Sequence, residues 1–184
     1  MRELSLNVMD VAQNSVRAQA TLVRISVTES DRSDRLVIEI ADDGCGMTEE
    51  QVNQVIDPFF TTRTTRKVGL GVPLFKLSAE QTGGSFSIRS KVGEGTVTTA
   101  SYVKSSVDMT PLGDINSTVK ILIQCNPDID FLFSHSTDIG GFELDTRELR
   151  QVLEGLPLDT PDVLMWITQF LDENTTEIYG GKTV

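Results

Sequence analysis

Two polar side chains near the start of the sequence have a spacing that suits a small oxygen-ligand site. Asp10 and Asn14 stand four residues apart, so on a helix they lie one turn apart and point the same way. An amide oxygen is a ligand that Mg²⁺ accepts together with phosphate oxygens and water, and we predict that Asn14 is the metal ligand. Asp10 could then polarise a water or a substrate hydroxyl as the catalytic residue, while Arg17 could reach a phosphate.

A glycine-rich segment, "DDGCGM" from Asp42, follows a predicted strand. Its glycines allow a tight backbone and the close approach of a ligand, and the first carboxylate can accept a hydrogen bond from an exocyclic amine. We predict that Asp42 reads adenine, with Gly44, Gly46 and Met47 beside the nucleotide. The alternative is that Asp-Asp-Gly after a strand is simply a turn.

A second glycine pair, in "KVGLG" from Lys67, opens a predicted helix. Helix N-termini offer unpaired amides and a partial positive charge to an anion. We therefore predict that the phosphates lie there, against Lys67, Gly69, Leu70, Gly71 and Val72. The alternative is that Gly69 or Gly71 only brings a helix close to a strand.

Two further segments complete the set of candidate residues. Thr96, which closes the "GEGT" turn, could place a hydroxyl near Asp42 and a bound water, or could merely begin a β-strand. The stretch from 57 to 76 is rich in cations and suits a phosphate ligand. We place Phe60 and Thr61 at the nucleotide, although Phe60 could instead belong to the core or anchor a loop.

Composition narrows the classes of function. The 184 residues allow one domain, or one domain with a small appendage. The formal net charge of -11 opposes binding to nucleic acid or acidic lipid surfaces. No signal peptide and no apolar run of about 20 residues is present, so we expect a cytoplasmic protein without a membrane partner. His135 is the single histidine, and we expect it to have a structural or surface role.

The elements that must position these residues follow from the hydrophobic pattern. Residues 4–18, with the exception of Leu6, place their apolar side chains on one half of a helical wheel, with Asp10 and Asn14 on the other. Helix 71–81 ends at a glycine pair. The predicted strands are two antiparallel pairs, 23–28 with 36–40 and 85–90 with 96–103.

The pattern changes after about Ser105. We predict a connector, then a hairpin of strands 119–124 and 129–133 that turns at residues 126–128. One helix should begin after Asp145, and a last, mostly apolar helix should begin at Pro161. That last helix, which contains Trp166, should pack onto the sheet in place of a strand layer, form a subunit interface, or cover a core of its own.

Taken together in this order, the motifs resemble the ATP-binding domain shared by histidine kinases, anti-sigma serine kinases, gyrase, Hsp90 and MutL. The resemblance covers about residues 2–103 and assigns 1–104 to this domain and 105–184 to an extension. It implies the Bergerat fold, an α/β (α+β) two-layer sandwich whose mixed sheet is covered by helices on one face. The β-hairpin and two helices after Ser105 are predicted from the hydrophobic pattern, because this segment resembles no family. It also implies that ATP and Mg²⁺ bind between the helices and a lid at 57–68, with an asparagine as the metal ligand.

The chain departs from this family in ways that bear on function. Asp10 stands where hydrolytic relatives commonly carry glutamate, the family's first strand is missing, and neither dimerisation helices nor an acceptor histidine are found. We therefore expect a regulatory protein kinase that acts in trans on an unidentified protein client, similar to anti-sigma kinases. The alternatives are an ATP-gated binding module without phosphotransfer and an ATPase of the clamp type, with a homodimer possible in each case.

Overall fold

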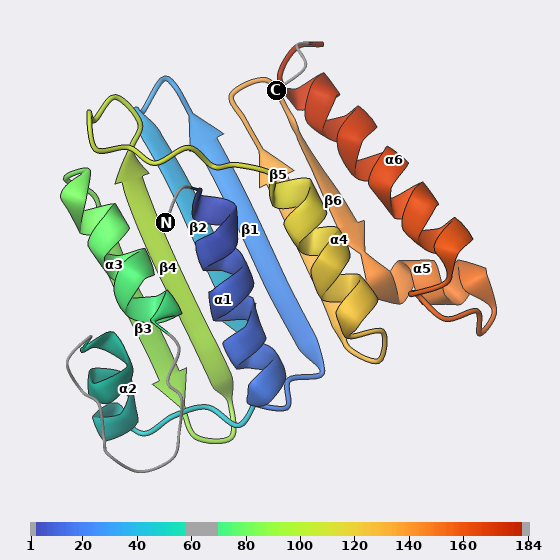
Figure 1. Cartoon of the computed structure of the whole chain (residues 1–184), viewed down its shortest axis with the longest axis horizontal. Coiled ribbons are helices and arrows are strands. Elements are labelled where there is room, and N and C mark those ends of the chain that lie inside the picture. Colours follow the sequence, from blue (N-terminus) through green and yellow to red (C-terminus); the bar gives the residue numbers. More distant parts are fainter. Residues whose placement is uncertain (1–2, 58–69, 182–184) are drawn as a thin grey trace.

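The computed structural model describes residues 3–57 and 70–181. These residues form a six-stranded sheet with the order β3-β4-β2-β1-β5-β6 (Figure 1). All neighbouring strands are antiparallel except β1 and β5, which are parallel. The sheet is therefore mixed, as predicted. Its strands are β1 (Leu22–Ser30), β2 (Arg35–Asp42), β3 (Ser85–Lys91), β4 (Gly95–Val103), β5 (Asp130–Ser136) and β6 (Gly141–Asp145).

The helices lie against one face of this sheet, with α1, α3 and α4 side by side in front of it (Figure 1). Along the strands, buried residues such as Ile25 and Ile40 alternate with exposed or half-buried ones such as Arg24 and Glu39. This period of two is typical of a sheet with one packed and one solvated face, so the predicted two-layer sandwich is confirmed. The helices are α1 (Leu4–Arg17), α2 (Glu49–Ile56), α3 (Gly71–Gln81), α4 (Ile115–Cys125), α5 (Thr146–Leu153) and α6 (Pro161–Ile178).

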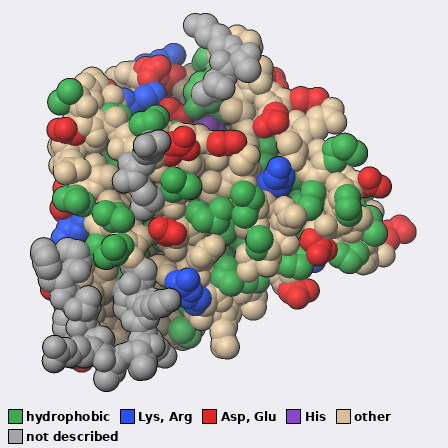
Figure 2. Space-filling view, in the orientation of Figure 1, with side chains coloured by type: hydrophobic (Ala, Val, Ile, Leu, Met, Phe, Trp, Pro, Cys, Tyr) green, Lys and Arg blue, Asp and Glu red, His purple; other side chains and the backbone are tan. Residues whose placement is uncertain are grey.

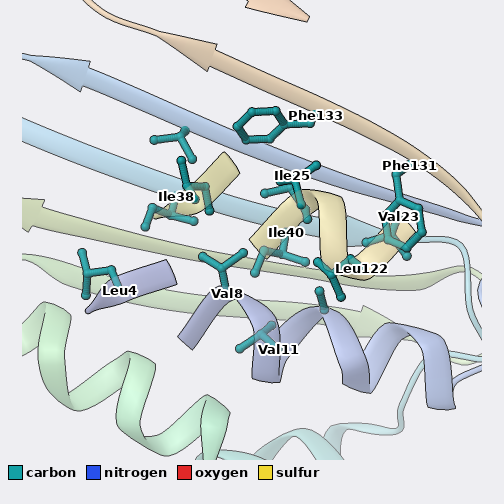
Figure 3. Close-up of a cluster of buried hydrophobic side chains, with 14 of the residues drawn as sticks. Leu4, Val8, Val11, Val23, Ile25, Ile38, Ile40, Leu122, Phe131 and Phe133 are labelled. Atoms are coloured by element: carbon teal, nitrogen blue, oxygen red, sulfur yellow. The ribbon is translucent and has the colours of Figure 1, made fainter. Parts of the chain in front are cut away.

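The hydrophobic core is shared between the first hundred residues and the segment that follows them. Val8 of α1 and Ile25 of β1 pack in one cluster with Leu122 of α4 and Phe133 of β5 (Figure 3). Each of these side chains is at most 1% exposed, and burying one of this size stabilises a fold by about 1.5–3 kcal/mol. The later segment therefore completes the core on which α1 rests.

The prediction of a strand at residues 119–124 is wrong, because this stretch lies in α4. The side chain of Asp114 accepts a hydrogen bond from the Ser117 amide and caps the helix. The residues that α4 buries follow a helical spacing, although the run is rich in the β-branched and aliphatic side chains that also suit strands. They are Ile115, Thr118, Val119, Leu122 and Ile123.

The hairpin of the later segment is formed by β5 and β6 and turns between residues 136 and 141, not at residues 126–128. Since residues 115–125 form a helix, residues 105–181 hold three helices, one more than expected. β5 lies beside β1, while α6 packs against α4 and β6 with Val163, Ile167 and Leu171 buried. A strand, and not the last helix, extends the sheet. Within residues 3–57 and 70–181, no helix is long and apolar enough to cross a bilayer.

A buried polar cluster joins the end of α6 to the sheet. Glu29 lies on β1, and its Oε1 accepts hydrogen bonds from the Tyr179 hydroxyl and from Nε2 of His135 at 3.1 Å. The ammonium of Lys104 lies 3.2 Å from its Oε2. Burial raises the pKa of Glu29, but these hydrogen bonds and the Lys104 charge outweigh it and lower the pKa to about 2. His135 is 1% exposed, so of the two roles expected for it the structural one fits this buried position and the surface one does not.

The cluster makes the stability of the protein depend on pH in the acid range. Because the folded-state pKa of Glu29 is depressed, its stabilising contribution is complete above the ordinary pKa of 4.5 and is lost as the pH falls towards 2. We expect Glu29→Gln to lower the free energy of unfolding by about 1–3 kcal/mol at pH 7 and by a smaller amount at pH 3, where part of the contribution is already lost. Urea denaturation between pH 3 and 7 measures this.

Glu39→Gln is the matched control, since Glu39 is a half-buried glutamate on the other face of the sheet whose carboxylate accepts a hydrogen bond from Thr99. We expect it to cost less than about 0.5 kcal/mol at any pH. If Glu29→Gln lowered the free energy of unfolding equally at pH 3 and pH 7, the proposed link between the ionisation of Glu29 and stability would be contradicted.

Candidate functional site

The predicted catalytic and metal-binding residues lie in the last two turns of α1. Asp10 is exposed and Asn14 is half-buried, one turn apart as the spacing predicts. Arg17 Nη1 donates to the amide oxygen of Asn14 at 3.3 Å. The guanidinium of Arg17 therefore lies beside this oxygen, where it could also contact a phosphate.

The N-terminus of α3 lies directly against Asp10. A Cβ built on Gly71 would be 2.7 Å from the Cβ of Asp10, a distance that only glycine permits. The side chain of Leu70, the N-cap residue of α3, makes no capping hydrogen bond and is 60% exposed. The positive end of α3 thus lies beside the carboxylate of Asp10, where an anion would be favoured. The glycine brings a helix close to another helix, not to a strand.

Asp42 is the last residue of β2, and both of its carboxylate oxygens have partners. Oδ2 accepts from the Ser15 hydroxyl at 2.6 Å, and Oδ1 accepts from the Gly44 amide at 3.0 Å. Ser15 is 3% exposed and belongs to α1, next to Asn14. The α1 helix therefore orients both the amide of Asn14 and the carboxylate of Asp42.

Sequence reasoning did not single out Ser15, because a small residue on the apolar side of a helix is unremarkable there. Its position directly after Asn14 is the signal that could have identified it. A residue one step along a helix turns by about 100°, so Ser15 faces the sheet while Asn14 stays near the surface.

The carboxylate next to Asp42 has a different role. Asp43 accepts hydrogen bonds from the Thr21 amide at 2.7 Å and from the Leu22 amide at 2.9 Å, and fixes the start of β1. Burial raises the pKa of Asp43, but a hydrogen bond from the Thr21 hydroxyl and those from the two amides lower it overall. The structure thus distinguishes two aspartates that the sequence places side by side.

Thr96 on β4 stands directly opposite Asp42 in the antiparallel register. Its hydroxyl lies 2.8 Å from the hydroxyl of Ser90, which also accepts from the Met47 amide at 2.8 Å. Ser90, a second residue that sequence reasoning missed, therefore joins the end of the first glycine segment to Thr96.

The glycines of the first segment serve contacts within the chain. A Cβ on Gly44 would lie 2.8 Å from the Cβ of Ala18, and one on Gly46, whose φ is +66°, would lie 1.9 Å from the Lys91 carbonyl oxygen. The segment is also held by a backbone hydrogen bond from Cys45 to Ala18 at 2.9 Å. It is thereby clamped between the end of α1 and the β3–β4 turn.

Four of the predicted binding residues, Phe60, Thr61, Lys67 and Gly69, lie outside the described residues. The other predicted site residues lie within the described part of the chain. The structure brings them to the end of the sheet near the last turns of α1: Asp10, Asn14, Arg17, Asp42, Gly44, Gly46, Met47, Leu70, Gly71, Val72 and Thr96.

The sequence model of the histidine kinase-, DNA gyrase B- and HSP90-like ATPase family matches residues 2–106, more than half of the chain. The chain belongs to this family. The match contains every candidate residue described above, and it supports ATP binding by the domain.

The relatives of this ATPase-family protein include sensor kinases. It is similar to the sensor histidine kinase ZraS of Salmonella typhimurium, with 30% identity over 99 residues that cover 54% of this chain and 21% of ZraS. The sensor histidine kinase AruS of Pseudomonas aeruginosa is 31% identical over 101 residues, which cover 52% of this chain and 10% of AruS. The chain thus spans about a fifth or less of the length of these relatives.

One solved structure shows the same fold over more of the chain. The N-terminal domain of a DNA repair protein aligns with a TM-score of 0.51 and 15% identity, over 79% of this chain and 52% of that one. The Aquifex aeolicus MutL ATPase domain complexed with ADP aligns with a TM-score of 0.49 and 14% identity, over 84% of this chain and 70% of that one. The first alignment reaches beyond the residues that the family model matches, so the shared fold includes part of the later segment.

The contact between Gly71 and Asp10 predicts the effect of one added methyl group. Gly71→Ala would force α3 away from Asp10, since the 2.7 Å contact is with the Cβ of that residue. We expect a loss of about 1–3 kcal/mol in unfolding free energy, despite the higher helix propensity of alanine, and weaker ATP binding. Urea denaturation and titration calorimetry measure the two effects.

Gly140→Ala is the control, because a Cβ there meets nothing within 4 Å and Gly140 is not among the residues with positive φ. It should leave stability and ATP affinity unchanged. A Gly71→Ala protein as stable as this control would show that α1 and α3 do not need their close approach.

Proposed function

We propose that this protein binds Mg²⁺-ATP through residues 1–104 and transfers the terminal phosphate to a side chain of a partner protein. The observation that carries the proposal is that one helix, α1, fixes both ends of the candidate site. Its Ser15 holds Asp42, while its Asp10 lies against the start of α3. Membership of the ATPase family supports the ligand, and the kinase relatives support the reaction class.

Asp42 would recognise the base. Its carboxylate accepts a hydrogen bond from Ser15 and therefore keeps a fixed orientation, with lone pairs left for the exocyclic amine of adenine. Guanine carries a carbonyl oxygen at the corresponding position, which cannot donate to a carboxylate. Thr96, opposite Asp42 on the neighbouring strand, would hold a water at the base.

The residues at the other end fit a metal-bound polyphosphate. The Asn14 amide oxygen is a hard donor at a half-buried position, with Arg17 beside it. Mg²⁺ needs few protein ligands when phosphate oxygens and water complete its shell, so Asn14 would suffice as the protein ligand. Bound Mg²⁺ would neutralise phosphate charge, and Arg17 and the backbone amides at the start of α3 would hold the phosphate oxygens.

Asp10 would act as the general base in the transfer. A hydroxyl of the partner attacks the terminal phosphorus and forms a new P–O bond, the bond between that phosphorus and its bridging oxygen breaks, and ADP leaves. The hydroxyl proton passes to the Asp10 carboxylate, which is exposed and free to receive a partner's side chain.

A second candidate function is an ATP-gated binding module without phosphotransfer. The short side chain of Asp10 favours it, because this carboxylate lies close to its own helix and to the start of α3 and reaches less far than a glutamate. The two functions predict the same nucleotide binding and differ only in whether phosphate is transferred.

Base recognition is tested by changing Asp42. We expect Asp42→Ala to reduce the preference for ATP over GTP by at least about tenfold, because the exocyclic amine loses its acceptor. Titration calorimetry with ATP, ADP and GTP, with and without Mg²⁺, gives the affinities. Asp43→Ala is the matched control, since Asp43 contacts Thr21 and Leu22, and it should keep the preference while losing stability. Equal preference in wild type and Asp42→Ala would exclude Asp42 as the adenine reader.

Phosphotransfer is tested by changing Asp10. We expect Asp10→Asn to keep ATP affinity within about threefold and to lower transfer by about 10²–10⁴-fold, the range typical of a lost general base. The protein is incubated with γ-labelled ATP and a source-cell extract whose own kinases have been inactivated. The measured quantity is the amount of label that becomes attached to proteins of the extract. Asn14→Ala serves as the comparison and should lose Mg²⁺-dependent binding as well. Tight ATP binding by the wild type with no labelled protein would favour the binding module.

A further inference from the structure

The net charge of the protein is concentrated in its later segment. Residues 105–184 contain 14 acidic and 4 basic residues, whereas residues 1–104 contain 13 acidic and 12 basic ones. Two of the four cations are already paired within the segment. Arg147 contacts Asp145 at 2.6 Å, and Arg150 contacts Asp130 at 2.7 Å. The segment therefore presents a strongly negative surface that its own cations do not neutralise.

Exposed apolar side chains stand among these acids on α5, on the loop that follows it and on the first half of α6. We name as the α5–α6 surface the residues Val152, Leu156, Met165 and Trp166, whose exposed fractions are 79%, 46%, 66% and 47%. Figure 2 shows hydrophobic side chains gathered over this part of the molecule, with acidic side chains around them and few basic ones. Singly exposed apolar residues are normal, but an apolar group with a polar rim is typical of an interaction site.

Trp166 is held in place on this surface. Its ring stacks on Phe170, with centroids 5.1 Å apart and planes 20° from parallel, and Phe170 packs edge-on against Phe142 of β6 at 6.1 Å. A half-exposed tryptophan that is already ordered loses little side-chain entropy on binding, and such residues often dominate an interface energetically.

The acids around these side chains have no cation to pair with in the part of the chain that the structure describes. Glu148, Glu154, Asp159 and Asp162 lie on or next to the two helices, and no ion pair between described residues includes them. A partner with apolar side chains along one face and Lys or Arg along its margins would complement both features. An amphipathic basic helix has this arrangement.

The charge also argues against other occupants. A second copy would bring an equally acidic segment against this one, and anionic lipid or nucleic acid would be repelled in the same way. We propose that the α5–α6 surface docks a basic amphipathic helix of a partner protein, with Trp166 as the apolar anchor. This inference goes beyond the proposed function, because such docking requires neither ATP nor phosphotransfer.

The position of the surface connects it to the nucleotide site. Arg150 of α5 binds Asp130 at the start of β5, whose amide donates to the Thr21 carbonyl at 2.9 Å. Thr21 in turn contacts Asp43. The register places Asp42, Val23 and Phe131 in one row across neighbouring strands. A helix docked on α5 would therefore lie at the same end of the sheet as the candidate ATP site.

The single tryptophan of the chain provides a direct test. The probe is a synthetic 18-residue helical peptide of Leu and Lys without aromatic residues, and its comparison is a scrambled peptide of the same composition that cannot form an apolar face. We expect the amphipathic peptide to shift Trp166 emission to shorter wavelength with saturation, and the scrambled peptide to bind at least about tenfold more weakly.

Met165→Asp separates apolar docking from simple charge attraction. It adds a negative charge, so attraction alone would strengthen peptide binding, whereas the proposal expects a loss of at least about tenfold. Leu77→Asp is the matched control, because Leu77 is 50% exposed on the distant helix α3, and it should change affinity by less than about twofold. Thermal unfolding checks that both variants are folded.

Two results would overturn the proposal. If the two peptides bound equally well, or if Met165→Asp left peptide binding unchanged, the interaction would depend on charge attraction alone and not on apolar docking. Concentration-dependent dimers of the wild type in sedimentation, abolished by Met165→Asp, would assign the α5–α6 surface to a second copy of the chain.

Discussion

Helix α1 is fixed at successive points along its length by groups that are distant in sequence, and the candidate site depends on this. The carbonyls of Pro111 and Leu112 accept hydrogen bonds from the Leu4 and Ser5 amides at its start. Gly71 packs against Asp10 near its middle, and the Ser15 hydroxyl binds Asp42 near its end. Because the helix is rigid, fixing these points also fixes where the side chains on its polar face stand.

The segment after residue 104 takes part in this arrangement and is no loose appendage. It supplies the carbonyls at the start of α1, a strand beside β1 and side chains to the core below the helix. It also carries nearly all of the net charge, because residues 1–104 contain almost equal numbers of acidic and basic side chains.

Local patterns predicted the elements that carry their own signals. The amphipathic period of α1, the strand pairs β1–β2 and β3–β4, and the glycine stop after α3 are all found.

The prediction was wrong at residues 119–124, because "VKILIQ" fits a strand as well as a buried helix. Its helical cap, Asp114, lies several residues earlier in what looked like a connector. The second partner of β1, the parallel strand β5, was not predicted either, since this pair joins residues about a hundred positions apart and leaves no local trace.

The sequence by itself determined the kind of chemistry available, because residue types and their spacing fix which donors, acceptors and glycines can share a helix face or a turn. The motifs from Asp10 to Thr96 stand in a fixed order along the sequence, and the sequence alone was enough to identify the ATPase family. Only the tertiary structure decided that Asp42 is held by Ser15 while Asp43 binds Thr21, and that Gly71 serves the contact of two helices. It also decided that the acidic segment completes the sheet. These facts depend on which distant groups come within hydrogen-bond or van der Waals distance, and no spacing along the chain encodes that distance.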